Sequence, residues 1–167
     1  MEIEKLPPPC GGEQRQRASE ARSASGGGRS MQIVDAARAW IGTPYVHQAS
    51  LKGVGCDCLG LLRGIWRELH GGEPEDMPPY APDWDVRGRE TMRDGLARHL
   101  NPIAPAEIAP GDVVLFRMVA RAPAKHCAIV ADREGTPTLI HARQNKRVSE
   151  EPFTPFWRKK SAYAFRL

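Results

Sequence analysis

The 167-residue chain is long enough to form one domain with a substantial hydrophobic core. Its formal net charge is +4, but its lysines and arginines are scattered among acidic residues and form no basic run typical of nucleic-acid binding. No apolar stretch approaches the roughly 20 residues that a membrane-spanning helix needs. We therefore expect neither a nucleic-acid partner nor membrane insertion.

The first 30 residues differ in composition from the rest of the chain. Residues 1–30 are rich in Gly, Ser, Pro, Arg and Glu, with too few apolar side chains to offset the entropy lost on ordering. We predict a flexible N-terminal arm over residues 1–30 and one folded domain over residues 31–167. The arm is either dispensable, if translation starts at Met31, or a docking peptide that orders on a partner.

The N-terminus does not indicate a Sec-type signal peptide. Its opening residues, MEIEKLPPPC, lack the positively charged region followed by an apolar stretch that such a peptide has. We expect the protein to be made in the cytoplasm. If its substrate lies outside that compartment, another component has to deliver it.

Helical periodicity dominates the first half of the domain. Over residues 31–42 one face is apolar, and Gly42 ends the predicted helix; the face comprises Ile33, Ala36, Ala37, Trp40 and Ile41. Residues 43–55 (TPYVHQASLKGVG) are expected to form a loop. A second helix is predicted from Cys58, with apolar residues at helical spacing: Leu62, Ile65, Trp66 and Leu69.

Gly71 and Gly72 are expected to end this second helix. The proline- and acid-rich residues 73–85 then form an excursion, and another helix carrying Met92, Leu96 and Leu100 follows. Beyond residue 109 the period changes to that of strands separated by turns; the predicted strand segments are 109–118, 126–132, 138–143, 146–153 and 161–167. Helices followed by an antiparallel meander predict the α+β class.

Four cysteines need an interpretation: Cys10, Cys56, Cys58 and Cys127. A chain of this length without an export signal favours free thiols over a disulfide framework. A zinc site is poorly supported, because structural zinc sites pair their cysteines as C-x₂₋₄-C, whereas Cys56 and Cys58 are separated by one residue. The remaining alternatives are a nucleophile and a small buried side chain.

Position along the helix favours Cys58 over Cys56 as a nucleophile. Cys58 lies at the start of the predicted helix, where Asp57 is suited to cap it and the helix dipole lowers a thiol pKa. The backbone N–H of Cys58 would also point toward a developing oxyanion. Position alone leaves the nucleophilic and the buried, structural roles of Cys58 equally open.

A thiol nucleophile needs a base and a group that orients the base. His126 begins one predicted strand and His141 lies in the next, after a turn at 133–137. A hairpin pairing 126–132 with 137–143 would bring the two histidines close to directly opposite each other. Two facing histidines are unusual as packing, but they are suitable as a base and its orienting group.

Five sequence segments, taken in order, resemble the NlpC/P60 superfamily of papain-like cysteine peptidases: GTPY (42–45), GCDCLGLL (55–62), PGDVVLF (110–116), HCAIVAD (126–132) and LIHA (139–142). The similarity runs from about residue 32 to the C-terminus. It implies an antiparallel sheet packed against the helical part that carries the catalytic cysteine. More narrowly, HQAS and GVGCDCLGLLRGIWRE resemble the branch found with tail genes of phages, prophages and gene transfer agents.

The resemblance implies roles for five residues. Cys58 is the nucleophile, His126 its base and His141 the polar group that orients His126. Tyr45 is placed near the oxyanion, and Asp57 beside the nucleophile, where in some members it helps to hold the free amine of the substrate. The chain departs from the family pattern after the nucleophile, where Leu59 replaces serine, in YVHQAS (45–50), and in Cys127-Ala128. These departures concern substrate specificity.

The implied function is cleavage of peptidoglycan stem peptides, between D-γ-glutamate and a diamino acid, without a metal or other cofactor. A phage-like tail or baseplate would carry the enzyme to the periplasm of a target cell. Two alternatives remain: a structural tail component with vestigial activity, and a lysis-type amidase on the same scaffold.

Overall fold

The computed structural model describes residues 27–80 and 88–167. Residues 1–26 of the predicted arm, and residues 81–87 of the proline-rich excursion, lie outside the described residues. A helix occupies residues 27–38, so residues 27–30 are helical, although their composition had assigned them to the arm. None of the helices in the described ranges is both long and apolar enough to cross a bilayer.

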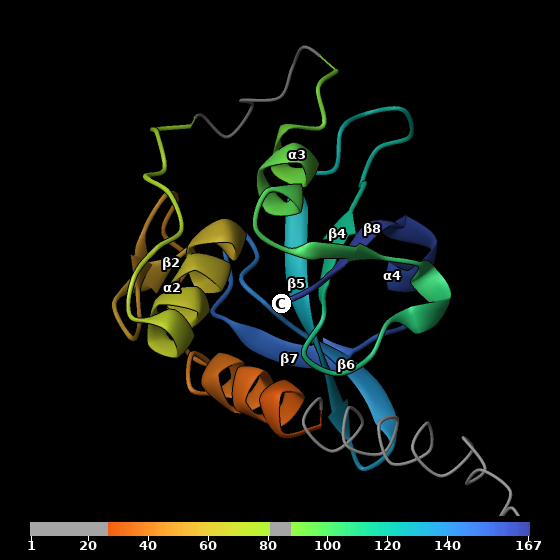
Figure 1. Cartoon of the computed structure of the whole chain (residues 1–167), viewed down its shortest axis with the longest axis horizontal. Helices are drawn as coiled ribbons and strands as arrows, with labels where there is room; N and C mark the ends of the chain where they lie inside the picture. Colours follow the sequence, from red (N-terminus) through yellow and green to blue (C-terminus); the bar gives the residue numbers. More distant parts are fainter. Residues whose placement is uncertain (1–26, 81–87) are drawn as a thin grey trace, which may run out of the picture.

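The main sheet has six strands in the order β3-β8-β4-β5-β6-β7, all of them antiparallel (Figure 1). The strands are β3 Asn101–Ile103, β4 Val113–Phe116, β5 His126–Arg133, β6 Thr136–His141, β7 Ser149–Pro152 and β8 Ser161–Arg166. The predicted meander holds for β4 to β7. The last strand, β8, returns to pair with β4, and the short strand β3, which the sequence did not indicate, pairs with β8.

Helices cover both faces of this sheet. The helix of residues 27–38 and α2 (Cys58–His70) pack on one face, where Trp40, Ile65 and Leu115 belong to one buried cluster (Figure 1). The other face is covered by α4 (Pro155–Lys160), whose Trp157 packs with Phe116. This α+β arrangement confirms the predicted fold class.

Two glycines let α2 lie close to its neighbours. A Cβ atom at Gly60 would overlap the backbone carbonyl oxygen of Ala49, and one at Gly64 would overlap the ring of Trp40. The helix ends as predicted, because Gly71 adopts the left-handed conformation (φ 80°) that favours glycine.

Shorter elements complete the structure. Strands β1 (Ser50–Leu51) and β2 (Gly55–Cys56) form a small antiparallel ribbon inside the predicted loop, directly before α2. The helix α3 (Thr91–Ala97) is shorter than predicted, and a single 3₁₀ turn, η1, covers Pro105–Glu107. The ribbon and α2 together determine where the nucleophile candidate lies.

Candidate active site

Cys58 is the first residue of α2, and Asp57 caps the helix as predicted. The Oδ1 atom of Asp57 accepts a hydrogen bond from the backbone N–H of Gly60 at 2.7 Å. The Cys58 N–H has no partner within the helix, because the first four N–H groups of any helix have none. This end of α2 therefore presents a half-buried thiol together with a free donor and the positive end of the helix dipole.

The pKa values of the neighbouring thiols distinguish Cys58 from Cys56. Hydrogen bonding with Cys127, together with hydrogen bonding and the positive charge of His126, holds the pKa of Cys58 well below its usual value, against the effect of burial. Cys56 is fully buried, and burial together with the negative charges of Asp57 and Cys58 raises its pKa to about 12. Of these two thiols, only Cys58 is suited to be a thiolate at neutral pH.

Cys127 lies beside the nucleophile candidate, a proximity that the sequence did not reveal. Its thiol donates to the backbone carbonyl oxygen of Cys58, with Sγ 3.2 Å from the oxygen. The hydrogen bond with Cys58, together with burial, raises the pKa of Cys127 well above its usual value, so this thiol stays protonated as a donor. Cys56, Cys58 and Cys127 are all free thiols, as expected; Cys10 lies outside the described residues.

His126 and His141 are adjacent, as predicted. The Nε2 atom of His126 lies 2.9 Å from the Nδ1 atom of His141, and their rings are 5.0 Å apart. The register of β5 and β6, in which Ile129 faces Ile140, is the predicted pairing of 126–132 with 137–143. It makes the two histidines diagonal neighbours on one face, close to the directly opposite arrangement. Because Nε2 of His126 faces His141, Nδ1 is the atom left for Cys58.

Trp157 packs against both histidines from α4, a helix that the sequence did not indicate. Its ring centroid lies 5.8 Å from that of His126 and 5.1 Å from that of His141. An indole ring packed beside an imidazole restricts the orientation of the imidazole. The segment PFWRKK was missed because it is only one and a half turns long.

Tyr45 lies near the nucleophile, as the family resemblance implied. It forms an isolated bridge with Cys56, and its N–H donates to the carbonyl of Lys146. Burial, with the negative charges of Asp57 and Cys58, raises the pKa of the Tyr45 hydroxyl. The hydroxyl therefore stays protonated and able to donate a hydrogen bond, as an oxyanion contact would require.

Asp57 is buried and its second carboxylate oxygen is also occupied. Oδ2 accepts hydrogen bonds from the Gln48 N–H at 2.8 Å and from the Tyr80 hydroxyl at 2.7 Å, and it lies 3.4 Å from Nδ1 of His47. In this structure Asp57 organises the loop before the nucleophile. A further role in holding a substrate amine stays a prediction.

The side chains of His47 and Gln48 hold the backbone at Tyr80. His47 and Gln48 both contact the backbone carbonyl oxygen of Tyr80, at 2.9 Å from Nε2 of His47 and 2.6 Å from Nε2 of Gln48. Gln48 adopts φ 63°, a left-handed conformation that favours glycine.

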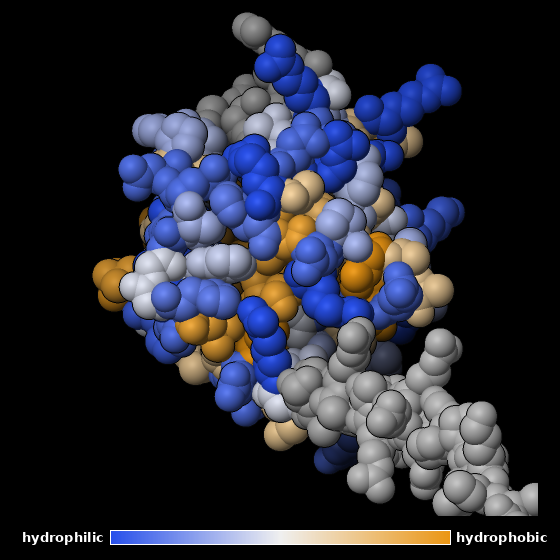
Figure 2. Space-filling view, viewed as in Figure 1, coloured by the Kyte–Doolittle hydropathy of each residue, from blue (hydrophilic) through white to orange (hydrophobic). Residues whose placement is uncertain are grey.

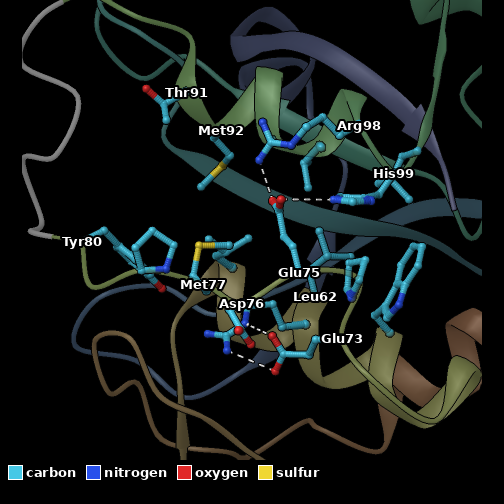
Figure 3. Close-up of a pocket in the computed structure, with 18 of the residues that line it drawn as sticks. Leu62, Glu73, Glu75, Asp76, Met77, Tyr80, Thr91, Met92, Arg98 and His99 are labelled. Carbon is cyan, nitrogen blue, oxygen red and sulfur yellow. Dashed lines mark hydrogen bonds and ion pairs between the residues drawn. The ribbon is translucent and has the colours of Figure 1, made fainter.

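A pocket of about 470 Å³ lies between α2, residues 73–80 and α3 (Figure 3). Met77 and Met92 face each other across it, while Arg98 and His99 lie beside Glu75 at its rim. Leu59, which follows the nucleophile, also lines the pocket. Figure 2 shows the molecule in the orientation of Figure 1. In the middle of the surface that is seen there, a band of apolar residues is flanked by hydrophilic ones.

Arg143 forms an ion pair with Glu151 at 2.8 Å. Within residues 27–80 and 88–167, no group of three or more His, Cys, Asp or Glu side chains is arranged to hold a metal ion.

A thiol at a helix N-terminus, packed against an antiparallel sheet that carries a histidine base, defines the class of papain-like cysteine peptidases. The NlpC/P60 family profile matches residues 42–166. The chain therefore belongs to the NlpC/P60 family.

Known relatives are similar in sequence and fold. The gamma-DL-glutamyl hydrolase of Bacillus subtilis (strain 168) is 27% identical over 129 residues, which make up 77% of this chain but only 27% of that protein. The NlpC/p60 domain of the peptidoglycan hydrolase SagA aligns with a TM-score of 0.54 at 21% identity, covering 83% of this chain and 98% of the domain. An NlpC/P60 family protein of Bacillus cereus ATCC 10987 aligns with a TM-score of 0.58 at 20% identity, over 82% of this chain and 39% of its own.

Proposed function

We propose that this protein is a cell-wall cysteine endopeptidase that cleaves the stem peptides of peptidoglycan. The observation that carries the proposal is the grouping of a low-pKa Cys58 with His126 and His141 at the start of α2. The names of two relatives, a gamma-DL-glutamyl hydrolase and a peptidoglycan hydrolase, support the substrate class.

The first chemical step is attack of the Cys58 thiolate on the D-γ-glutamyl carbonyl carbon. The oxyanion that forms accepts hydrogen bonds from the Cys58 N–H and from the Tyr45 hydroxyl. When the C–N bond breaks, protonated His126 gives its proton from Nδ1 to the amine of the diamino acid, which leaves.

The second step returns the enzyme to its starting state. A water molecule attacks the thioester carbonyl while Nδ1 of His126 accepts one of its protons. The C–S bond breaks, the γ-glutamyl carboxylate leaves, and Cys58 is again a thiolate beside an imidazolium.

We further propose that a phage-like tail or baseplate delivers the enzyme to the periplasm of a target cell, where it opens the wall during DNA entry. Support for this role comes from the resemblance of residues 47–68 to the tail-associated branch of the family. Residues 1–30, of which residues 1–26 lie outside the described part, would then serve as the docking segment.

The activity is tested by mass spectrometry of purified diaminopimelate-type peptidoglycan after incubation with the full chain. We expect fragments cut between γ-D-glutamate and the diamino acid, and none with the Cys58→Ala variant. Cleavage between the glycan and the stem peptide would instead identify an amidase. A folded, reduced protein that releases no fragment would favour a structural tail component.

Delivery is tested separately, by immunoblotting particles purified on a density gradient from cells that express the gene in its natural context. The tail proposal predicts that the protein co-sediments with particles. A lysis enzyme would stay in the soluble fraction.

A further inference from the structure

Glu151, on the edge strand β7, lies beside the histidine pair. It lies on β7 directly opposite Leu139, which makes it a diagonal neighbour of His141 on the same face. Its Oε1 atom is 3.1 Å from Nε2 of His141, and the contact has the distance of an ion pair without the alignment of a hydrogen bond. The carboxylate thus approaches the ring nitrogen that His126 does not use.

The Glu151 carboxylate is held in place by two other donors. Oε1 accepts a hydrogen bond from the Trp157 indole N–H at 2.8 Å, and Oε2 accepts one from Nη2 of Arg143 at 2.8 Å. A carboxylate with both oxygens engaged by fixed donors has a defined position and keeps its charge. Glu151 therefore presents a stationary negative charge to His141.

His141 is a neutral ring beside this charge. It is fully buried, and burial together with the positive charges of His126, Arg143 and Lys146 lowers its pKa to about 3. A neutral imidazole has one N–H, and a carboxylate beside Nε2 favours the tautomer in which Nε2 carries it. Nδ1 of His141 is then an acceptor for the Nε2–H of His126, and this leaves Nδ1 of His126 directed to Cys58.

We propose that Glu151 is a positioning residue that acts through His141 to fix the tautomer of His126 and to stabilise its protonated form. The chain of contacts is Cys58, His126, His141 and Glu151, taken from α2, β5, β6 and β7 in turn. This inference rests on the proposed function only in that His126 serves Cys58 as its base. No step of the reaction touches Glu151 itself.

Other charged and titratable groups lie around Cys58 and His141, and substitution of Glu151 leaves all of them in place. Cys58 has His126, Cys127, Asp57, Tyr45 and Tyr80 around it. Charges that reach His141 are those of Glu151, His126, Arg143 and Lys146. Replacing Glu151 with glutamine removes one negative charge from this set and preserves the side-chain shape.

The test is the pH dependence of Cys58 alkylation by iodoacetamide, which reports the thiolate without any peptidoglycan. In Glu151→Gln the thiolate–imidazolium pair loses the counter-charge that supports its imidazolium, so the pair gives up this proton at a lower pH. We expect the alkaline midpoint of the alkylation curve, at which the pair becomes a free thiolate beside a neutral imidazole, to fall by about one pH unit. A folded Glu151→Gln protein with the wild-type midpoint would overturn the proposal.

Glu150→Gln is the matched control, because Glu150 lies on the same strand and pairs instead with Arg38 at 3.0 Å. It should lower the melting temperature and leave the alkylation midpoint unchanged, whereas an equal shift in both variants would contradict a specific role for Glu151. If the wild-type protein shows the expected alkylation curve but does not cleave peptidoglycan, the result counts against the proposed substrate and not against the role of Glu151.

A second measurement needs no substitution in the site. Nitrogen-15 NMR of the histidine rings in the wild-type chain distinguishes protonated from unprotonated ring nitrogens. We expect His141 to carry its proton on Nε2 and to have an unprotonated Nδ1 at neutral pH. A proton on Nδ1 of His141 would overturn the proposal even if Glu151→Gln did not fold.

Discussion

The Nε2 atom of His126 lies 2.9 Å from the Nδ1 atom of His141, and this contact assigns different roles to the two histidines. His141 is fully buried and stays neutral, while His126 is half-buried at the start of its strand beside Cys58. In the proposed mechanism the buried ring orients its neighbour, and the accessible ring transfers protons. The same division of roles explains several measurable properties of the protein.

The three described thiols should react with iodoacetamide at very different rates. The lowered pKa of Cys58 keeps it a thiolate as the pH falls below the usual thiol range, whereas the raised pKa values of Cys56 and Cys127 keep them protonated. At pH 6.5 we expect peptide mapping of a Cys10→Ser chain to find label on Cys58 alone. Comparable labelling of Cys56 in the folded protein would contradict the assignment of the nucleophile.

Substitution of the histidines should affect turnover to different extents. His126→Ala removes the proton carrier, and we expect kcat/KM on peptidoglycan fragments to fall by about 10³ or more. His141→Ala leaves the carrier but frees its orientation, for which a loss of about 10² is expected. His70→Ala, at the other end of α2, is the control and should retain full activity. Equal losses for His70 and His126 would point to destabilisation and not to catalysis.

Burial of neutral His141 should make the fold sensitive to mild acid. Its pKa is about 3 in the folded chain against 6.5 for the free side chain, so between these values the unfolded state binds the extra proton. The free energy of unfolding is therefore not reduced by this group above pH 6.5, and it falls as the pH is lowered toward 3. At pH 5 the loss is about 2 kcal/mol.

The measurement for this effect is urea unfolding of the wild type and of His141→Asn at pH 7 and pH 5. The variant should be less stable at pH 7, but its stability should fall less between the two pH values. Parallel losses in both proteins would assign the acid sensitivity to other groups.

Removal of the Tyr80 hydroxyl should weaken the loop before the nucleophile. In Tyr80→Phe the Oδ2 atom of buried Asp57 loses a 2.7 Å hydrogen bond, and we expect a cost of about 1–3 kcal/mol in the free energy of unfolding. Activity should fall as well, because Asp57 caps the helix that begins at Cys58. Unchanged stability on thermal unfolding would show that the hydroxyl is dispensable to Asp57.

Two glycines in helices should respond oppositely to alanine. Gly60→Ala places a methyl group on the Ala49 carbonyl oxygen, so we expect a loss of stability of about 2 kcal/mol or more and a displaced Cys58. Gly95→Ala in α3 has room for the methyl group and should gain up to about 1 kcal/mol from helix propensity. If Gly60→Ala keeps the wild-type melting temperature and activity, the contact between Gly60 and Ala49 is looser than the structure indicates.

Local sequence features predicted the elements that carry the chemistry. Asp57 and Cys58 could be placed at a helix start because capping depends on a few consecutive residues. His126 and His141 could be placed on adjacent strands because a short turn between two apolar runs implies a hairpin. The residues that support them could not be predicted in this way. Glu151 and Trp157 lie in segments with weak periodicity, β7 and the short helix α4.

The sequence by itself determined the fold class, the order of the longer helices and strands, and the place of Cys58 at a helix start, since each depends on periodicity or on neighbours within one turn. Only the tertiary structure decided which side chains surround these groups: Cys127 and His126 at the thiol, Tyr80 at Asp57, and Glu151 at His141. These contacts join residues from different elements. Their distances follow from strand register and helix packing, which no local pattern encodes.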